Sequence, residues 1–444
     1  MGDQAIVPMR TYILMSKFRF VYMLLRRPDG TLDRRTDEYL DKKEPANATP
    51  RRGVATTDVC IEKASGLWAR VFWPTEIYHE DDYLEAGAEE VEVDDDGARE
   101  AGGARGEEEQ ESEVEEEEEG GENGEKEEEK EKEEQEQEVE VEKEELEESA
   151  ESKEQKAASG SGSGSTEVED KEQRDKTPVV DALTKEKVED EQYNELEEEG
   201  LRPLVVYFHG GSFVHSCANS RIYDTLCRNM ARMCGVVILS LNFHRAPEYK
   251  CPVPYEDGLT CLRWINSRAG KLCLYPFQCR TKKVFLAGDT GGANIAHHVA
   301  AKAPLEGISL SGMVLIMPMF GGEQRTTHER RLDGKYFVSI QDRDWYWRAF
   351  LPEGANRDDP ACNPLSQQAP SMSELDLPPS LVVVGGFDLL RDWQLRYISA
   401  LERAGKDVEL LYLEKVTMGF FLMPNSPFFF AFIAKVREFL KKSF

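Results

Sequence analysis

The 444-residue sequence predicts an α/β fold, in which helices cover both faces of a mostly parallel central sheet. The first of two observations indicates this class, and the second separates the folded residues from an acidic segment. From residue 201 onward, short and continuously apolar runs alternate with helical patterns, as buried parallel strands and their connecting helices do. The acidic residues are also segregated. Residues 81–200 hold 52 of the 86 Asp and Glu residues and 13 of the 55 Lys and Arg residues, which leaves 34 acidic and 42 basic residues and a net charge of +8 elsewhere.

The segment 80–200 is therefore predicted to be an acidic, low-complexity insert. It is rich in Glu and Lys repeats, includes a Ser/Gly stretch at 160–165, and has too little apolar content to offset chain entropy, so we expect disorder. A solvated helix over 125–150 is an alternative, because Glu and Lys favour helices. The insert is interpreted as a spacer or as a charged brush that attracts basic partners.

The remaining sequence predicts one helical segment and one large domain. Residues 1–50 contain helices at 10–26 and 33–40, and a domain is formed by 51–79 and 201–444. Two strands are expected within 54–72. Further strands are expected at 204–208, 236–243, 284–287, 313–317, 381–384 and 408–413, and helices at 218–233, 255–267, 292–303, 341–350, 391–404 and 428–442.

Composition excludes several classes of function. The nine cysteines form no Cys-x-x-Cys pair, which predicts reduced thiols in the cytoplasm or nucleus and no metal site. The apolar run 13–25 contains Lys17 and Arg19 and is too short to cross a membrane. We expect no cofactor and no nucleic-acid or membrane partner.

Three motifs then specify the fold more closely. Gly288-Asp-Thr-Gly-Gly292 lies between a predicted strand and a predicted helix, where α/β-hydrolases place the nucleophile elbow Gly-x-Ser-x-Gly. His209-Gly-Gly-Ser212 ends an earlier strand, as the oxyanion loop of lipases and esterases does. Asp388 follows a later strand, at the place of the triad acid. Three elements in the correct chain order predict an α/β-hydrolase fold.

The catalytic triad, however, is incomplete. None of the seven histidines lies beyond Asp388, and the loop that should carry the base has Met418 instead. Loss of such a base costs on the order of a millionfold in turnover. Thr290 replaces the nucleophilic serine and puts a β-branched side chain into a strained turn. His297 and His298 follow on the next helix, but we expect them to pack inside the fold rather than act as the base.

The remaining oxyanion loop is still suited to an anion. Backbone N–H groups of Gly210 and Gly211, with the hydroxyls of Ser212 and Thr290, would hold a carboxylate as well as a transient oxyanion. The sequence therefore predicts a non-catalytic site for a small carboxylate ligand.

Long runs outside these motifs resemble the soluble gibberellin receptors of land plants, which are non-catalytic relatives of plant carboxylesterases and hormone-sensitive lipases. The resemblance covers nearly the whole chain except 80–200. It is carried by Leu25-Arg-Arg-Pro-Asp-Gly30, Pro45-Ala-Asn-Ala48, His209-Gly-Gly-Ser-Phe213, Ile222-Tyr-Asp-Thr-Leu-Cys227, Arg331-Leu-Asp-Gly-Lys-Tyr-Phe-Val338, the run 342–354, Asp392-Trp-Gln394 and Leu411-Tyr-Leu-Glu414.

The resemblance implies that residues 1–50 form a helical lid over a gibberellin, a diterpenoid acid. The outer face of the closed lid would recruit a growth repressor of the DELLA type, in the nucleus and cytoplasm. The ligand pocket would comprise Gly210, Gly211, Ser212, Tyr223, Thr290, Phe337, Val338, Asp342, Arg343, Tyr346, Gly419 and Leu422, with Met15, Phe18, Arg19 and Tyr22 from the lid.

Four positions depart from the family pattern. Thr290 replaces a serine, Phe421 a tyrosine, Arg19 a lysine, and Met418 a small aliphatic residue. The hydroxyl lost at Phe421 is expected to cost about 1–3 kcal/mol of binding free energy. Two alternatives remain open: a carboxylesterase that hydrolyses small esters with a non-standard triad, and an interaction scaffold that needs no ligand.

Overall fold

The computed structural model describes residues 9–76, 201–424 and 426–442, and these belong to one compact unit. The predicted acidic insert, with its alternative helix at 125–150, lies outside the described residues. The division into lid, domain and insert therefore stays a prediction.

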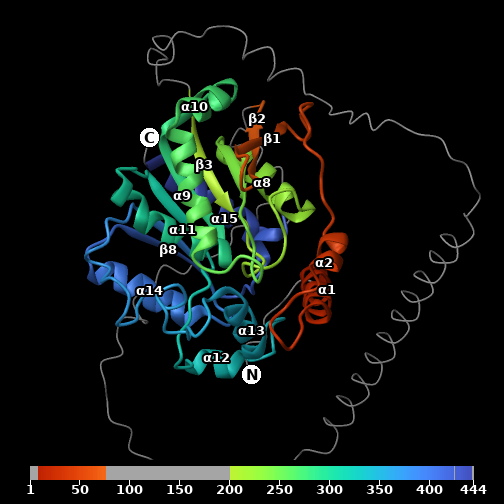
Figure 1. Ribbon diagram of the computed structural model, residues 1–444, viewed down its shortest axis with the longest axis vertical. Coiled ribbons are helices and arrows are strands. Elements are labelled where there is room, and N and C mark those ends of the chain that lie inside the picture. Colours follow the sequence, from red (N-terminus) through yellow and green to blue (C-terminus); the bar gives the residue numbers. More distant parts are fainter. Residues whose placement is uncertain (1–8, 77–200, 425, 443–444) are drawn as a thin grey trace, which may run out of the picture. The chain divides into compact units, whose positions relative to one another are not determined.

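An eight-stranded sheet forms the centre of the described chain (Figure 1). Its strand order is β1-β2-β4-β3-β5-β6-β7-β8. The pairs β1–β2 and β2–β4 are antiparallel, and all other neighbours are parallel. The strands are β1 (Val54–Glu62), β2 (Leu67–Pro74), β3 (Arg202–Phe208), β4 (Val237–Asn242), β5 (Cys279–Asp289), β6 (Gly312–Ile316), β7 (Ser380–Gly385) and β8 (Val408–Leu413).

Both faces of the sheet are covered by helices. Alternate residues of β3 show this directly, because Leu204 and Val206 belong to one apolar core and Val205 to another. Helices α9, α11 and α14 supply the first core, and α8 and α15 supply the second. The helices are α1 (Met9–Leu25), α2 (Arg34–Leu40), α8 (Arg221–Cys234), α9 (Val253–Asn266), α10 (Arg268–Leu274), α11 (Gly291–Lys302), α12 (Thr327–Leu332), α13 (Ile340–Phe350), α14 (Arg391–Arg403) and α15 (Pro427–Lys442), with short 3₁₀ turns η1 (Tyr275–Phe277), η2 (Ala303–Glu306) and η3 (Phe420–Leu422).

The two N-terminal helices, α1 and α2, form the lid helices. Figure 1 shows them beside α13. Arg26 Nη2 lies 2.5 Å from Asp342 Oδ1, and the Trp345 indole donates a 2.9 Å hydrogen bond to the carbonyl of Arg27. Helix α2 begins at Asp33, whose carboxylate accepts from the Thr36 amide and so caps the helix. These contacts fix the turn between the lid helices on α13.

The expected strands and long helices are present, with ends that shift by a few residues. Strand β5 is longer than predicted, because the polar residues after Cys279 pair with the start of β3. The short helices α10 and α12 were not predicted. All nine cysteines are free. Among the described helices, none is long and apolar enough to cross a membrane.

The first turn of α11 approaches the carboxyl end of β3 at Gly292. A Cβ atom built there would lie 2.0 Å from the carbonyl oxygen of Phe208. At Gly307, which has a φ of +70°, nothing lies within 4 Å of such an atom.

We therefore expect Gly292→Ala to lower the free energy of unfolding by at least about 3 kcal/mol, because backbone atoms must move. The matched variant Gly307→Ala meets only the strain of a left-handed residue and should cost about 1 kcal/mol. Chemical denaturation of the two variants measures this. Equal losses would contradict the close approach of α11 to the end of β3.

Candidate functional site

Thr290 occupies the sharp turn between β5 and α11. Its φ of 49° and ψ of −113° lie outside the regions that β-branched residues favour. The turn is held because the Thr290 amide donates to Ile316 O at 2.9 Å, and the Asn294 amide donates to Thr290 O at 3.2 Å. The expected strained elbow is present, with threonine at its apex.

The loop after β3 forms a second unusual turn beside the elbow. Gly211, Ser212 and Phe213 all have positive φ values, of 90°, 52° and 67°. The amides of the two residues that follow Phe213 both donate to the carbonyl of Gly211, which closes the turn. The loop therefore presents Ser212 toward Thr290 at the carboxyl end of the sheet, where ligands bind in open parallel sheets.

A cavity lies between these turns and the lid helices. It encloses about 720 Å³ of space free of protein atoms, including the part open to solvent. Its lining includes fifteen of the sixteen residues expected around the ligand: Met15, Phe18, Arg19, Tyr22, Gly211, Ser212, Tyr223, Thr290, Phe337, Val338, Asp342, Arg343, Tyr346, Gly419 and Leu422.

Gly210 is the expected residue that does not line the cavity. A Cβ atom at Gly210 would lie 2.0 Å from Asp289 Oδ2 and 2.7 Å from the Tyr223 hydroxyl. Gly210 thus lies behind these side chains, and its contribution to the site is to let them approach the backbone.

Six further residues line the cavity, namely Arg26, Ser216, Ile222, Asp289, Met418 and Phe421. Two of them had a usable signal in the sequence. Arg26 follows Tyr22 by one helical turn, and Asp289 is adjacent to Thr290. Met418 and Phe421 were identified as departures from the family pattern, not as lining residues. Ser216 and Ile222 carry no motif that marks them.

The triad remnants do not form a proton relay. The Asp388 carboxylate is buried and accepts from the Gln394 amide at 2.7 Å and from the Leu390 backbone amide at 3.1 Å. Burial raises the pKa of Asp388, against the opposing charge of Arg343. No imidazole contacts this carboxylate within the described residues, and Met418 occupies the place of the base.

His297 and His298 are packed inside the fold, as expected. Nδ1 of His297 lies 2.9 Å from the Tyr397 hydroxyl, and the His298 ring is stacked on Tyr255. Burial lowers the pKa of His297 to about 4. Neither ring lines the cavity, so neither replaces the missing base.

Arg343 is a buried cation in the wall of the cavity. Its side chain donates to the Ser212 hydroxyl at 3.2 Å and to two thioether sulfurs, those of Met319 at 3.3 Å and Met418 at 3.0 Å. Nε has no partner, and within the described residues no carboxylate lies within ion-pair distance. Burial lowers the pKa of this guanidinium, against the more distant charge of Asp388. The site thus holds a positive charge that its own neighbours leave largely uncompensated.

Asp289 is the acidic group nearest the elbow. The hydroxyls of Tyr207 and Tyr223 donate to its carboxylate at 2.8 and 3.1 Å, and the Thr290 hydroxyl lies 3.4 Å away. Burial raises the pKa of Asp289 to about 7, against these hydrogen bonds. Burial thus favours the protonated form of Asp289, and its carboxyl group lies within hydrogen-bond distance of the Thr290 hydroxyl.

The lid contributes two aromatic rings, one thioether and two guanidinium groups to the cavity lining. Phe18 is stacked on Tyr22, with the ring centres 5.6 Å apart. Burial raises the pKa of Tyr22 well above its ordinary value, so its hydroxyl is neutral. Within the part of the chain that the structure describes, no group of His, Cys, Asp and Glu side chains could hold a metal ion. The cavity wall thus combines apolar side chains with charged and hydroxyl groups, on the lid side as well as beside the elbow.

Comparison with known proteins agrees with this architecture. Residues 205–422 match a family model described as an alpha/beta hydrolase fold. A fungal esterase structure from Rhizomucor miehei, 23% identical, aligns with a TM-score of 0.50 over 55% of this chain and 76% of the esterase, which supports the fold alone.

Two curated relatives come from Arabidopsis thaliana. Probable carboxylesterase 6 is 38% identical over 43% of this chain and 57% of its own length. Gibberellin receptor GID1C is 37% identical over 99% of this chain and 95% of its own length. The extent of the second match includes the lid helices as well as the hydrolase domain. The chain belongs to the gibberellin receptor family, a branch of the carboxylesterase-like α/β-hydrolases.

Proposed function

We propose that this protein is a hormone receptor that binds a gibberellin-type diterpenoid carboxylic acid without hydrolysing esters. In this proposal the ligand occupies the cavity between the elbow and the lid helices, and the covered lid recruits a DELLA-type repressor. The site of action is the nucleus and cytoplasm. The observation that carries the proposal is the uncompensated guanidinium of Arg343 in the cavity wall.

Desolvation of the Arg343 guanidinium favours an anionic ligand. A buried cation without a counter-charge loses much of its hydration energy, and an anion at hydrogen-bond distance restores it. The Arg343 guanidinium, with the hydroxyls of Ser212 and Thr290 beside it, is therefore suited to a carboxylate. Apolar and aromatic lid residues such as Met15 and Phe18 suit the hydrocarbon rings of such a ligand.

The non-catalytic part of the proposal rests on proton transfer. Ester hydrolysis requires a group that takes the proton of the attacking hydroxyl. Thr290 lies beside Asp289, whose oxygens already accept two tyrosine hydroxyls, and Met418 has no proton-accepting nitrogen. The alternative of an esterase would need Asp289 itself to act as the base.

The outer face of the lid supports the proposed protein partner. Among the described residues, seven of the ten exposed large apolar side chains lie on the lid helices: Tyr12, Ile13, Phe20, Met23, Leu24, Tyr39 and Leu40. Leu24 is 65% and Tyr39 76% exposed. A cluster of this kind marks a protein interaction surface. The alternative of a ligand-independent scaffold uses the same surface and differs only in whether binding needs the hormone.

Replacing Arg343 tests the ligand. We expect Arg343→Met to weaken gibberellic acid binding by about 10- to 100-fold, because a charge-assisted hydrogen bond is lost. Binding of gibberellic acid methyl ester should be weak in both proteins and change little. Isothermal titration calorimetry measures these affinities.

The matched control is Arg348→Met, an exposed arginine on the same helix, which should bind as the unaltered protein does. Binding of the ester as tightly as the acid, or no binding of either at millimolar ligand, would contradict the proposal.

Thr290→Ala tests the absence of catalysis. Because no base activates the hydroxyl, we expect the slow release of p-nitrophenol from p-nitrophenyl acetate to be the same in the unaltered protein and in this variant. The rate should match that of a heat-unfolded sample. Turnover that disappears in Thr290→Ala would instead support the esterase alternative.

The partner surface is tested by Leu24→Asp. A charge in the centre of an apolar interface should reduce capture of the DELLA-type repressor by at least about tenfold, with gibberellic acid affinity retained. Leu305→Asp is the control, since Leu305 is 85% exposed on η2 of the hydrolase domain. Pull-down with and without gibberellic acid gives both readouts. Equal capture by the two variants excludes this surface, and capture that ignores the hormone favours the scaffold.

A further inference from the structure

His215 is enclosed between the lid helices and the hydrolase domain. It follows β3 in the chain and is completely buried. Its Nδ1 lies 2.7 Å from Asp37 Oδ1 of α2, and its Nε2 lies 3.1 Å from the Tyr346 hydroxyl of α13. Its ring is stacked on Tyr22 of α1, with ring centres 3.7 Å apart and planes 5° apart. Both lid helices and α13 therefore meet at one imidazole.

Two of these three neighbours also line the cavity, namely Tyr22 and Tyr346. Asp37 does not, because it lies on α2, which contributes no residue to the cavity wall. His215 thus connects a helix that is remote from the ligand with two tyrosines that surround it. A displacement of α2 that breaks the Asp37 contact leaves the imidazole without the group that orients it.

We propose that Asp37 and His215 form a proton-sensitive latch, which holds α2 on the hydrolase domain and fixes Tyr22 and Tyr346 in the cavity wall. Both are positioning residues, since neither lines the cavity. The latch rests on the proposed function only for the identity of the ligand in the cavity. Docking of the lid helices on the hydrolase domain does not depend on that identity.

The contacts of the latch fit a neutral imidazole. Nδ1–H donates to the Asp37 carboxylate, and Nε2 accepts from the Tyr346 hydroxyl. A proton added at Nε2 reverses that hydrogen bond, so the Tyr346 hydroxyl accepts from the ring and must direct its own proton elsewhere in the cavity wall. Protonation would therefore place a buried positive charge in the latch and change the polar contacts of the cavity wall.

The charges around the imidazole act in opposite directions. Burial lowers the pKa of His215, Asp37 opposes this, and the guanidinium groups of Arg34 and Arg26 lower the pKa further. Arg245 faces the same carboxylate, with Nη1 at 3.9 Å from Asp37 Oδ2. The uncharged hydroxyls of Tyr22 and Tyr346 complete the surroundings. The net result is a pKa below the ordinary histidine value.

The direction of the pH dependence follows from this shift. With the lid helices undocked, His215 meets water and regains its ordinary pKa, whereas docking lowers it. Docking therefore releases the proton, and protonated His215 favours the undocked state. Docking is complete above the ordinary histidine pKa and weakens as the pH falls below it toward the lowered value.

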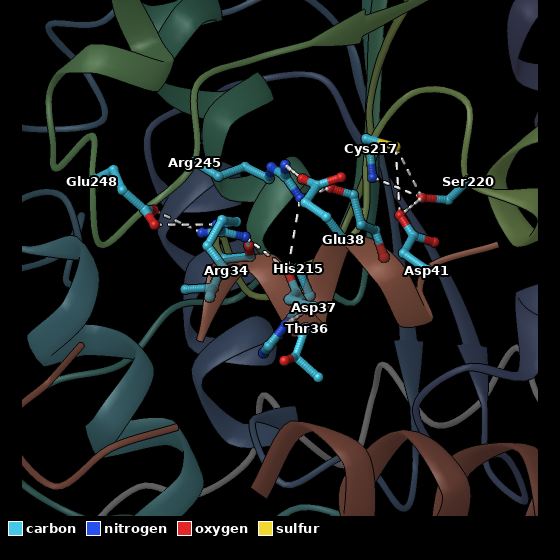
Figure 2. A network of polar contacts seen from close by, with 12 residues as sticks. Arg34, Thr36, Asp37, Glu38, Asp41, His215, Cys217, Ser220, Arg245 and Glu248 are labelled. Atoms are coloured by element: carbon cyan, nitrogen blue, oxygen red, sulfur yellow. Dashed lines mark hydrogen bonds and ion pairs between the residues drawn. The ribbon is translucent and has the colours of Figure 1, made fainter. Parts of the chain in front are cut away.

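Other contacts of α2 provide matched controls. Figure 2 shows them on either side of the latch: Arg34 with Glu248, Glu38 with Arg245, and Asp41 with Ser220. These pairs anchor α2 but touch neither cavity tyrosine. Glu38→Gln therefore weakens docking without removing the latch. His244 lies 2.9 Å from Asp257, both within the hydrolase domain, so His244→Gln removes a similar pair that does not involve the lid helices.

The experiment follows amide hydrogen exchange of residues 34–40 in the full chain without ligand. The protection factor compares the observed with the intrinsic exchange rate, so it removes the direct chemical effect of pH. Between about pH 7.5 and about pH 5.5, protection should fall by up to about tenfold in the unaltered protein. His215→Gln should abolish this slope and His244→Gln should keep it. Glu38→Gln should lower protection at both pH values with the slope unchanged.

A slope that persists in His215→Gln, or no slope in the unaltered protein, would overturn the latch. Nitrogen NMR of the His215 imidazole in the unaltered protein gives a second readout that needs no substitution. Titration at an ordinary histidine pKa, with the lid helices still protected, is also a refutation. Because neither measurement uses a hormone, failure of the latch remains separate from failure of the proposed ligand.

The latch also predicts a difference in affinity once gibberellic acid binding is established. His215→Gln should weaken binding more than Glu38→Gln does when both are compared at equal protection of α2, because only the first variant frees Tyr22 and Tyr346. Equal affinities under that condition would show that the pair anchors the helix without positioning the cavity.

Discussion

The site depends on the close approach of the first turn of α11 to the carboxyl end of β3. The turn that carries Thr290 and the turn that carries Ser212 are brought together because Gly292 has no side chain to separate them. Both turns use left-handed backbone, which only strong surrounding packing maintains. The backbone turns of the hydrolase architecture are thus retained around Thr290. What remains is a rigid floor for the cavity.

Methionine in place of a histidine at position 418 also affects the charge balance around Arg343. An imidazole after β8 would sit near Asp388, as an acid and base pair. Met418 instead directs its sulfur toward Arg343, so the guanidinium has soft, uncharged acceptors where it could have had a stronger partner. The cavity thus holds a buried positive charge beside Met418, which suits the anionic ligand of the proposed function.

The sequence predicted most of the fold and the floor of the site, because both rest on local patterns. The elbow at Thr290, the loop at Gly211 and the acid at Asp388 each follow an apolar strand, and the order of these motifs sets the topology. The absence of a base could be predicted in the same way. The short helix α12 could not, since six residues give too little periodicity to recognise.

Contacts between distant segments escaped prediction for a different reason. Asp37 and His215 are 178 positions apart, and nothing near either residue marks a partner. The isolation of Arg343 also depends on three-dimensional packing, because a sequence cannot show that no carboxylate reaches a guanidinium. Gly210 was expected in the cavity since it belongs to the oxyanion motif, yet its position behind Asp289 is set by how tightly two side chains pack on it.

Helix α1 carries one more consequence. Met15 and Leu25 are buried on its inner side, while Leu24 and Met23 are exposed on its outer side. The helix therefore carries large apolar side chains on its solvent-exposed side as well as on its buried side. A 17-residue helix is marginal by itself and owes its order to what it packs against. Its exposed side is thus an apolar surface that another protein could cover. In the proposed receptor, a bound repressor would cover those side chains.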